Sequence, residues 1–249
     1  MIYSIINHKA QVGKTTSTIN IGAALVEKEK KVLLVDLDPQ SNLTKGLGIK
    51  KFEISIYDNL CGEKMINTID YKKNISVLPS SLELSLAEIT LNTDPGKEHI
   101  LQDILTPLKK KFDYILIDCP PSLGFLTINA LVASQFIIIP IHAEFLSLTC
   151  LPHLTNMIDK IRCRLNKNLE IKSVFLTQLN KSKIFDENAK ESIQDFFGDR
   201  FFTSSISFNV ALSESLAQCK DIFLYNKNCK GAQEYRQLCN EMIMKKVFK

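Results

Sequence analysis

The sequence has no uncharged apolar stretch of the roughly 18 residues that a membrane-spanning helix requires. Its first residues, MIYSIINHK, lack the basic segment and the long apolar run of a signal peptide. It contains no CxxC, and its seven cysteines are widely spaced and odd in number. This pattern argues against a zinc site or a disulfide framework and predicts reduced thiols in the cytoplasm.

No internal repeat, low-complexity tract or Gly/Ser linker divides the 249 residues, so we expect one domain over 1–249. Hydrophobic residues make up 45% of the chain and charged residues 23%, which is too apolar for a disordered protein. The net charge of +4 is uneven: residues 1–159 carry 15 Lys/Arg and 17 Asp/Glu, whereas residues 160–249 carry 16 and 10. A basic C-terminal third is compatible with a polyanionic partner and equally with a solvated surface.

Short apolar runs alternate with longer segments of helical periodicity. The runs predicted as strands are 2–7, 31–37, 75–79, 113–119, 136–141 and 171–179, with 201–206 as a candidate further strand. The segments predicted as helices are 15–30, 81–91, 97–111, 145–165, 190–197 and 230–248. Such alternation predicts an α/β fold, a single doubly wound domain with a mainly parallel sheet. Ligands bind such sheets beyond the carboxyl ends of the strands.

A candidate phosphate loop, His8–Thr16, follows the first predicted strand and opens a helix. A strict GxxxxGK[ST] loop would have Gly where His8 stands, but the residues that contact phosphate and metal in such a loop are present. Gly13 lets backbone N–H groups approach a phosphate, Lys14 supplies a cation, and Thr15 offers a hydroxyl to Mg²⁺. A plain turn with a helix cap is the alternative interpretation.

Two further motifs place carboxylates at the ends of predicted strands. Asp36 and Asp38 leave the second strand on one face, and Asp118 ends an apolar run as in a Walker B strand. Alone, a carboxylate at a strand end is often a solvated surface group. Beside a phosphate loop, the pair suggests one group for the metal and one for the attacking water.

These motifs together resemble the ParA/Soj family of deviant Walker A ATPases, which includes the MinD relatives. The family's KGGVGKTT is matched by Lys9–Thr16, its VLLVDLDPQxN by Val32–Asn42, and its DYIIIDCPPSLG by Asp113–Gly124. The segment Gly231–Tyr235 is similar to the family's GAxxY. The resemblance covers nearly the whole chain and implies a P-loop type of α/β fold.

The resemblance also implies ATP and Mg²⁺ as cofactors and an ATP-dependent homodimer with the nucleotides at its interface. Lys14 is then the phosphate lysine, Lys9 reaches the partner's phosphates, and Asp38 orients the attacking water, so these three are the expected catalytic residues. Mg²⁺ is expected at Thr15, Asp36 and Asp118, directly or through water. The residues expected to contact ATP are Lys9, Ala10, Gln11, Val12, Gly13, Lys14, Thr15, Thr16, Pro120, Gln178, Ser207 and Asn209.

The chain departs from the family at two places. Ala10 and Gln11 replace the paired glycines of the loop, and a positive φ at either would cost about 1 kcal/mol or more. Nucleotide binding is then expected to survive while hydrolysis or dimer closure weakens. Phe208 replaces the arginine of the family's IPRN, so the base pocket and the DNA face depart from the pattern too.

We expect a ParA-like ATPase, a slow hydrolase stimulated by DNA and by a ParB-type centromere-binding partner, that acts in plasmid or chromosome partition. Its expected location is the cytoplasm, associated with the nucleoid, and no N-terminal helix-turn-helix is expected. Ala10 and Gln11 motivate one alternative, a nucleotide-dependent binding switch with little or no hydrolysis. The apolar residues and three lysines of Leu238–Lys249 motivate another, a MinD-like membrane-cycling ATPase, although a helix packed on the sheet explains them more simply.

Non-specific DNA is expected to bind basic residues that flank turns in the C-terminal third. The candidates are Lys181, Lys183, Arg200, Lys220, Lys227 and Lys230. Each phosphate that they neutralise should add about 0.9 to the salt slope of log K. A dimer doubles these contacts, so binding is expected only with ATP, and Phe208 predicts weaker binding than in relatives.

Overall fold

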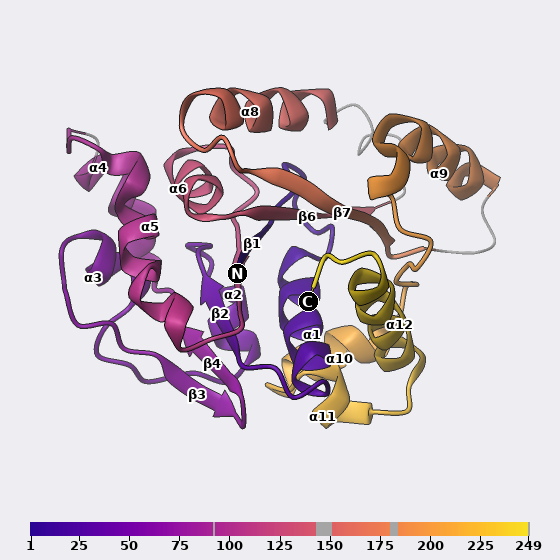
Figure 1. The fold of residues 1–249 in the computed structure, drawn as a ribbon. Helices are drawn as coiled ribbons and strands as arrows, with labels where there is room; N and C mark the ends of the chain where they lie inside the picture. Colours follow the sequence, from indigo (N-terminus) through magenta and orange to yellow (C-terminus); the bar gives the residue numbers. More distant parts are fainter. Residues whose placement is uncertain (92, 143–150, 180–183, 249) are drawn as a thin grey trace.

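The sheet lies at the centre of the molecule, between two layers of helices (Figure 1). The computed structural model describes residues 1–91, 93–142, 151–179 and 184–248. The strands are β1 (Ile2–Ile5), β2 (Val32–Asp36), β3 (Ile69–Lys72), β4 (Ile75–Leu78), β5 (Tyr114–Asp118), β6 (Phe136–His142) and β7 (Glu170–Thr177), in the order β3-β4-β2-β5-β1-β6-β7. Every neighbouring pair is parallel except β3 with β4. The predicted fold class is confirmed.

The central strands are buried along their whole length, as their unbroken apolar sequences predict. Every residue of β1, β2, β4 and β5 is buried. The register pairs Asp36 of β2 with Asp118 of β5, and Asp118 with Ile5 of β1. The carboxyl ends of these three strands therefore meet at one edge of the sheet.

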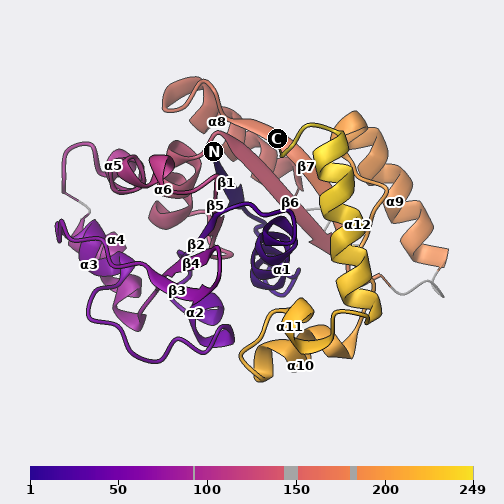
Figure 2. The same cartoon turned by 60° about the horizontal axis from the view of Figure 1, so that its bottom comes forward.

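The helices form the two outer layers. The α-helices are α1 (Lys14–Val26), α2 (Asn42–Gly46), α3 (Ile56–Leu60), α4 (Ala87–Thr90), α5 (Ile100–Leu105), α6 (Phe125–Ala133), α8 (Leu151–Arg164), α9 (Ile184–Phe197), α10 (Val210–Ala217), α11 (Ile222–Asn226) and α12 (Lys230–Met244). The 3₁₀ helices are η1 (Leu82–Leu86), η2 (Lys97–His99), η3 (Pro107–Lys110) and η4 (Gly198–Arg200). One buried cluster joins α3, α5, α6 and α8 to the sheet, and a second joins α1, α11 and α12 to its other face. Figure 2 shows α12 alongside α1.

The structure differs from the predicted elements at several places, and the predicted helix 81–91 is divided into η1 and α4. The antiparallel edge strand β3 was not predicted, because its half-buried IDYK sequence has no apolar run. The segment 201–206 forms no strand, and isolated bridges join Phe201 to Val174 and Ser207 to Leu179. The predicted helix 97–111 is divided into η2, α5 and η3, and Pro107 begins η3 because proline has no N–H to donate. Residues 145–150 of another predicted helix lie outside the described residues.

The end of the chain packs into the core. Val247 and Phe248 are 2% and 1% exposed, and the Phe248 ring lies 4.9 Å from that of Tyr3 and 5.1 Å from that of Tyr114. The Tyr3 hydroxyl donates a hydrogen bond of 2.5 Å to the Val247 carbonyl. Most of the apolar residues that suggested a membrane-surface helix therefore belong to the core cluster on this face of the sheet, whereas Met244 is 75% exposed. No helix in the described part of the chain is long and apolar enough to cross a membrane.

Candidate functional site

The loop between β1 and α1 forms one side of a cavity of about 630 Å³ at the carboxyl edge of the sheet. Its lining residues are Ala10, Gln11, Gly13, Lys14, Thr15, Thr16, Asp38, Gln40, Asn42, Lys45, Gly46, Pro121, Gln178, Leu216, Ala217 and Cys219. Gln11 and Gly13 have φ values of 61° and 80°. Such alternation turns successive backbone N–H groups toward one point, a geometry that binds anions, and α1 adds the positive end of its dipole. A volume in this range suits a nucleotide-sized ligand.

Lys14 is the buried cation of this loop. Its side chain is 7% exposed, and its ammonium donates to the carbonyls of Asn7 at 3.2 Å and Lys9 at 3.0 Å. Burial lowers the pKa of Lys14, and the nearby Asp118 carboxylate opposes that change. The loop thus holds a buried positive charge that is bonded to two backbone carbonyls, and an anion can replace these carbonyls.

Asp118 lies directly beside the loop. Its carboxylate accepts hydrogen bonds from the Thr15 hydroxyl at 2.6 Å and the Thr18 hydroxyl at 3.4 Å. Burial, and next the charge of Asp36, raise the pKa of Asp118 well above its usual range. A divalent cation would offset this buried negative charge, and the Thr15 hydroxyl and the Asp118 carboxylate are the hard oxygen donors that Mg²⁺ prefers.

No three His, Cys, Asp or Glu side chains gather into a metal-binding group within the described residues. Mg²⁺ usually keeps several waters and is bound by one or two carboxylates together with substrate phosphates. Thr15 and Asp118 therefore fit the predicted magnesium site.

Asp36 and Asp38 lie differently from one another. Asp38 lines the cavity and accepts the backbone N–H of Gln40 at 2.9 Å. Asp36 is fully buried and accepts both the N–H and the hydroxyl of Thr44, at 2.8 and 2.6 Å. Burial raises the pKa of Asp36 to about 6. Asp38 can thus reach a ligand in the cavity, whereas Asp36 fixes α2, and its contact with Mg²⁺ stays a prediction.

A hydrogen-bond chain extends from these carboxylates to β4. The Ser80 N–H donates to the Thr44 hydroxyl at 3.0 Å, and the Ser80 hydroxyl donates to the Asp38 carbonyl at 2.8 Å. Thr44 and Ser80 were missed in the sequence because polar residues near strand ends are common and carry no spacing signal. They hold the Asp38 segment in place.

The end of β7 braces the phosphate loop. The Thr177 hydroxyl donates to the Val12 carbonyl at 2.9 Å, and the Gln178 amide donates to the Gln11 carbonyl at 2.5 Å. Gln178 itself has a φ of 54°. Of the two loop residues that replace the family glycines, Gln11 adopts a positive φ and Ala10 does not. Gln178, expected to touch the nucleotide, thus also orients the loop.

A smaller cavity of about 140 Å³ adjoins the first beyond Gly13 and Thr16. Its lining residues are Gly13, Thr16, Thr177, Gln178, Ile206, Ser207, Phe208, Asn209, Leu212, Ser213 and Tyr235. The predicted contacts Ser207 and Asn209 therefore lie together at one end of the phosphate site. Pro120 lines neither of these two cavities, and its neighbour Pro121 lines the larger one.

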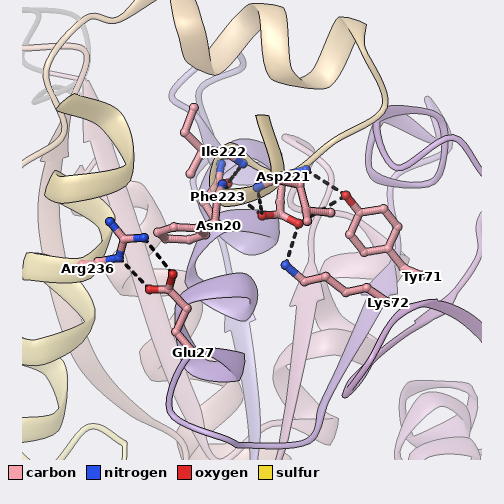
Figure 3. A network of polar contacts seen from close by, with 9 residues as sticks. Asn20, Glu27, Tyr71, Lys72, Asp221, Ile222, Phe223 and Arg236 are labelled. Carbon is pink, nitrogen blue, oxygen red and sulfur yellow. Dashed lines mark hydrogen bonds and ion pairs between the residues drawn. The ribbon is translucent and has the colours of Figure 1, made fainter. Parts of the chain in front are cut away.

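The far wall of the larger cavity, residues 216–219, is anchored by Asp221, which follows it (Figure 3). The buried Asp221 carboxylate caps α11 and bonds the ammonium of Lys72 at 2.7 Å. The Tyr71 hydroxyl donates to this carboxylate at 3.2 Å and accepts the Asp221 N–H at 2.9 Å. Edge strand β3 thereby fixes a wall that comes from about 150 residues later in the chain.

A second set of contacts joins α11 and α12 to α1 (Figure 3). The Asn20 side chain accepts the Ile222 N–H at 2.9 Å. The Arg236 guanidinium makes two bonds to Glu27, at 2.6 and 2.7 Å, and lies 4.8 Å from the Phe223 ring. These contacts therefore connect the segment that follows the cavity wall to α1, the helix that begins at the phosphate loop.

None of the four described DNA candidates lines the cavity, although Lys220 directly follows Cys219, which does. Arg200, Lys220, Lys227 and Lys230 are exposed at helix ends, and Lys230 lies 3.7 Å from Glu234. Lys181 and Lys183 lie outside the described residues. Their use in DNA binding stays a prediction.

Known proteins resemble the chain over nearly its whole length. A family model described as an AAA domain matches residues 1–171. The sporulation initiation inhibitor protein Soj of Bacillus subtilis is 40% identical over 248 residues, 97% of each chain. Among solved structures, a cobyrinic acid a,c-diamide synthase from Mycobacterium smegmatis, with bound ATP analog and magnesium, is 29% identical and has a TM-score of 0.85 over 97% of this chain and 93% of its own. A putative plasmid partition protein from Borrelia burgdorferi bound to AMPPNP is 29% identical, with a TM-score of 0.84 over 98% of both chains.

Proposed function

The chain belongs to the ParA/Soj family of deviant Walker A ATPases, and we propose that it hydrolyses ATP with Mg²⁺ in the cavity at the phosphate loop. Two observations at the N-terminus of α1 together support this proposal: Lys14 is buried, and the Thr15 hydroxyl donates a hydrogen bond to the Asp118 carboxylate. The structural relatives that contain an ATP analog, AMPPNP and magnesium support the same ligands.

The residues of the loop would bind and orient the phosphates. Lys14 would exchange the carbonyls of Asn7 and Lys9 for phosphate oxygens, while the N–H groups around Gly13 cradle them. Mg²⁺, held by Thr15 and Asp118, would neutralise charge that develops on the transferred phosphoryl group. Asp38 lines the cavity and would orient the attacking water.

The wider role proposed is DNA partition. In it, two ATP-bound copies pair across the nucleotides, and Lys9 of each reaches the other's phosphates, so that hydrolysis requires the dimer. The dimer binds non-specific DNA in the nucleoid of the cytoplasm, and a ParB-type partner stimulates slow turnover. The relatives named Soj and the plasmid partition protein support this role.

Steady-state phosphate release, with and without duplex DNA, tests the enzymatic proposal. Turnover that disappears in a Lys14→Ala variant supports it. Phosphate release that survives this change would come from a contaminant and would leave the assignment without support.

A nucleotide-dependent switch with little turnover is a second candidate, favoured by the positive φ of Gln11. The strain lies where two copies and the γ-phosphate would approach. Tight binding of a non-hydrolysable ATP analogue, with no phosphate release above that of Lys14→Ala, would favour the switch over the hydrolase.

A further inference from the structure

Lys45 of α2 contributes a second ammonium group to the lining of the larger cavity. We propose that this ammonium binds the terminal phosphate of ATP, the group that ADP lacks, and thereby makes the site selective for ATP over ADP. This contact rests on the proposed function, since it belongs to the same ligand in the same cavity. Lys45 lies beyond the motif Val32–Asn42, so the sequence did not single it out.

The Lys45 ammonium is accessible to a ligand. The residue is exposed, and its ammonium donates to the Gln40 carbonyl at 2.9 Å. Lys45 takes part in none of the ion pairs between described residues. Lys14 is held in the same way, by the carbonyls of Asn7 and Lys9. Because an ammonium bonds a charged phosphate oxygen more strongly than a neutral carbonyl, a phosphate in the cavity would displace the Gln40 carbonyl.

Gln40 places the Lys45 ammonium beside Asp38. The Gln40 N–H donates to the Asp38 carboxylate at 2.9 Å, and the Gln40 carbonyl accepts the Lys45 ammonium at 2.9 Å. The carboxylate and the ammonium are thus bonded to the two polar groups of one residue, and both side chains line the cavity. Asp38 is the group proposed to orient the water that attacks the terminal phosphate. Lys45 therefore lies at the end of the cavity where that phosphate would bind.

The backbone that carries Lys45 is fixed by contacts from three segments. The Lys45 N–H donates to the Ser41 carbonyl at 2.9 Å, and the Cys219 thiol donates to the Lys45 carbonyl at 3.7 Å. The preceding residue, Thr44, donates its N–H and its hydroxyl to the buried Asp36 carboxylate, at 2.8 and 2.6 Å. Ligand binding would therefore require only the end of the Lys45 side chain to move, which keeps the entropic cost of the contact low.

The charges that line the cavity explain why a cation is needed at this end. Lys14 and Lys45 are the cationic residues of the lining, and Asp38 is the anionic one. A phosphate beside Asp38 is repelled by its carboxylate, because like charges at short range raise the free energy of binding. The Lys45 ammonium would offset this repulsion for the terminal phosphate of ATP. ADP places no phosphate there, so its binding would depend on Lys14 and Mg²⁺ alone.

The size of the effect follows from the exposure of Lys45. A hydrogen bond between charged groups changes a binding constant by about tenfold or more, and solvent screening of an exposed lysine keeps the change near the lower value. After hydrolysis, the ammonium would return to the Gln40 carbonyl, which accepts it in this structure. The contact would therefore favour ATP over its product by about tenfold.

The test measures the Kd of AMPPNP and of ADP, each with Mg²⁺, by isothermal titration calorimetry. Lys45→Met removes the ammonium and keeps an unbranched side chain, whereas Lys45→Arg keeps the charge. Lys50→Met is the matched control, because Lys50 is an exposed lysine of the segment after α2 and does not line the cavity.

Lys45→Met should bind AMPPNP about tenfold more weakly than the unchanged protein, while the Kd of ADP changes less than about twofold. Lys45→Arg should stay within about threefold, and Lys50→Met within about twofold, for both nucleotides. In phosphate release, Lys45→Met should raise the KM for ATP about tenfold and change kcat less than about threefold, because the contact already forms in the ground state.

Equal losses of AMPPNP and ADP affinity in Lys45→Met, or no loss at all, would overturn the contact. A selective loss of AMPPNP affinity in Lys50→Met, or a fall in kcat with an unchanged KM in Lys45→Met, would overturn it too. In these cases nucleotide binding and hydrolysis by the unchanged protein would leave the proposed function intact. Absence of nucleotide binding by the unchanged protein would overturn the proposed function together with the contact.

Discussion

Replacing Gln178 by Glu removes the amide donor that holds the carbonyl of Gln11, while the length of the side chain stays the same. In the structure this amide approaches the carbonyl to 2.5 Å, and Gln11 adopts a φ of 61°. After Gln178→Glu, a carboxylate oxygen would face the carbonyl oxygen. The loop would then lose the contact that offsets the strain of a left-handed Gln.

The magnitude follows from the strain and from the contact. A left-handed non-glycine residue costs about 1–2 kcal/mol. One hydrogen bond contributes about 1 kcal/mol net, and leaving a carbonyl without its donor costs about 1–3 kcal/mol. If the ATP-binding loop must restore this conformation on binding, Gln178→Glu should weaken ATP affinity by about 1–2 kcal/mol, or roughly five- to thirtyfold.

Gln11→Gly should remove most of the dependence of ATP affinity on the Gln178 amide. Glycine adopts positive φ without the steric cost, so the brace has less strain to offset. In the Gln11→Gly background, Gln178→Glu should therefore cost less than about threefold in affinity. The expected coupling energy between the two positions is about 1 kcal/mol.

The assay is the Kd of a fluorescent ATP analogue with Mg²⁺, measured for the four proteins of this cycle, together with kcat and KM for phosphate release. Gln194→Glu is the matched control, because the exposed Gln194 amide makes the same kind of contact to the Gly198 carbonyl, at 3.1 Å, far from the site. The reasoning is refuted if the two changes are additive, or if Gln194→Glu weakens binding as much as Gln178→Glu.

Three further outcomes are expected. Lys14→Ala should abolish micromolar nucleotide binding in calorimetry, because the buried phosphates lose their compact cation, and retained binding would refute the loop assignment. Asp38→Ala should keep ATP binding, stop phosphate release and trap any ATP dimer in size-exclusion chromatography; a trapped dimer from Asp36→Ala instead would exchange the two roles. Phe248→Ala should lower the free energy of unfolding in urea by about 3–5 kcal/mol, since this ring is 1% exposed, whereas Phe208→Ala, at a residue 69% exposed, should change it by less than about 0.5 kcal/mol, and equal losses would contradict the packing.

The sequence predicted the elements that its periodicity marks strongly. The apolar run 113–119 became β5 at Tyr114–Asp118, because strands buried on both faces leave no polar position. Edge strand β3 was missed because a half-buried edge strand needs no apolar run. The segment 201–206 was predicted as a strand, but a single isolated bridge, between Phe201 and Val174, joins it to β7.

The site was predictable where spacing along the chain determines it. Lys14, Thr15 and Asp38 line one cavity, and Asp118 contacts Thr15, as the order of motifs indicated. Thr177 was not found, since its role is a contact to a backbone carbonyl 165 residues earlier.

The manner in which Asp221 anchors the cavity wall has a consequence for substitutions in that wall. Asp36 and Asp118 are set by strand register, so an insertion or deletion within β2 or β5 would displace them. Residues 216–219 instead depend on the side-chain contacts of Asp221, with no strand of their own (Figure 3). A substitution in this wall can therefore change the shape of the cavity without displacing Asp36 or Asp118, which the strand register places.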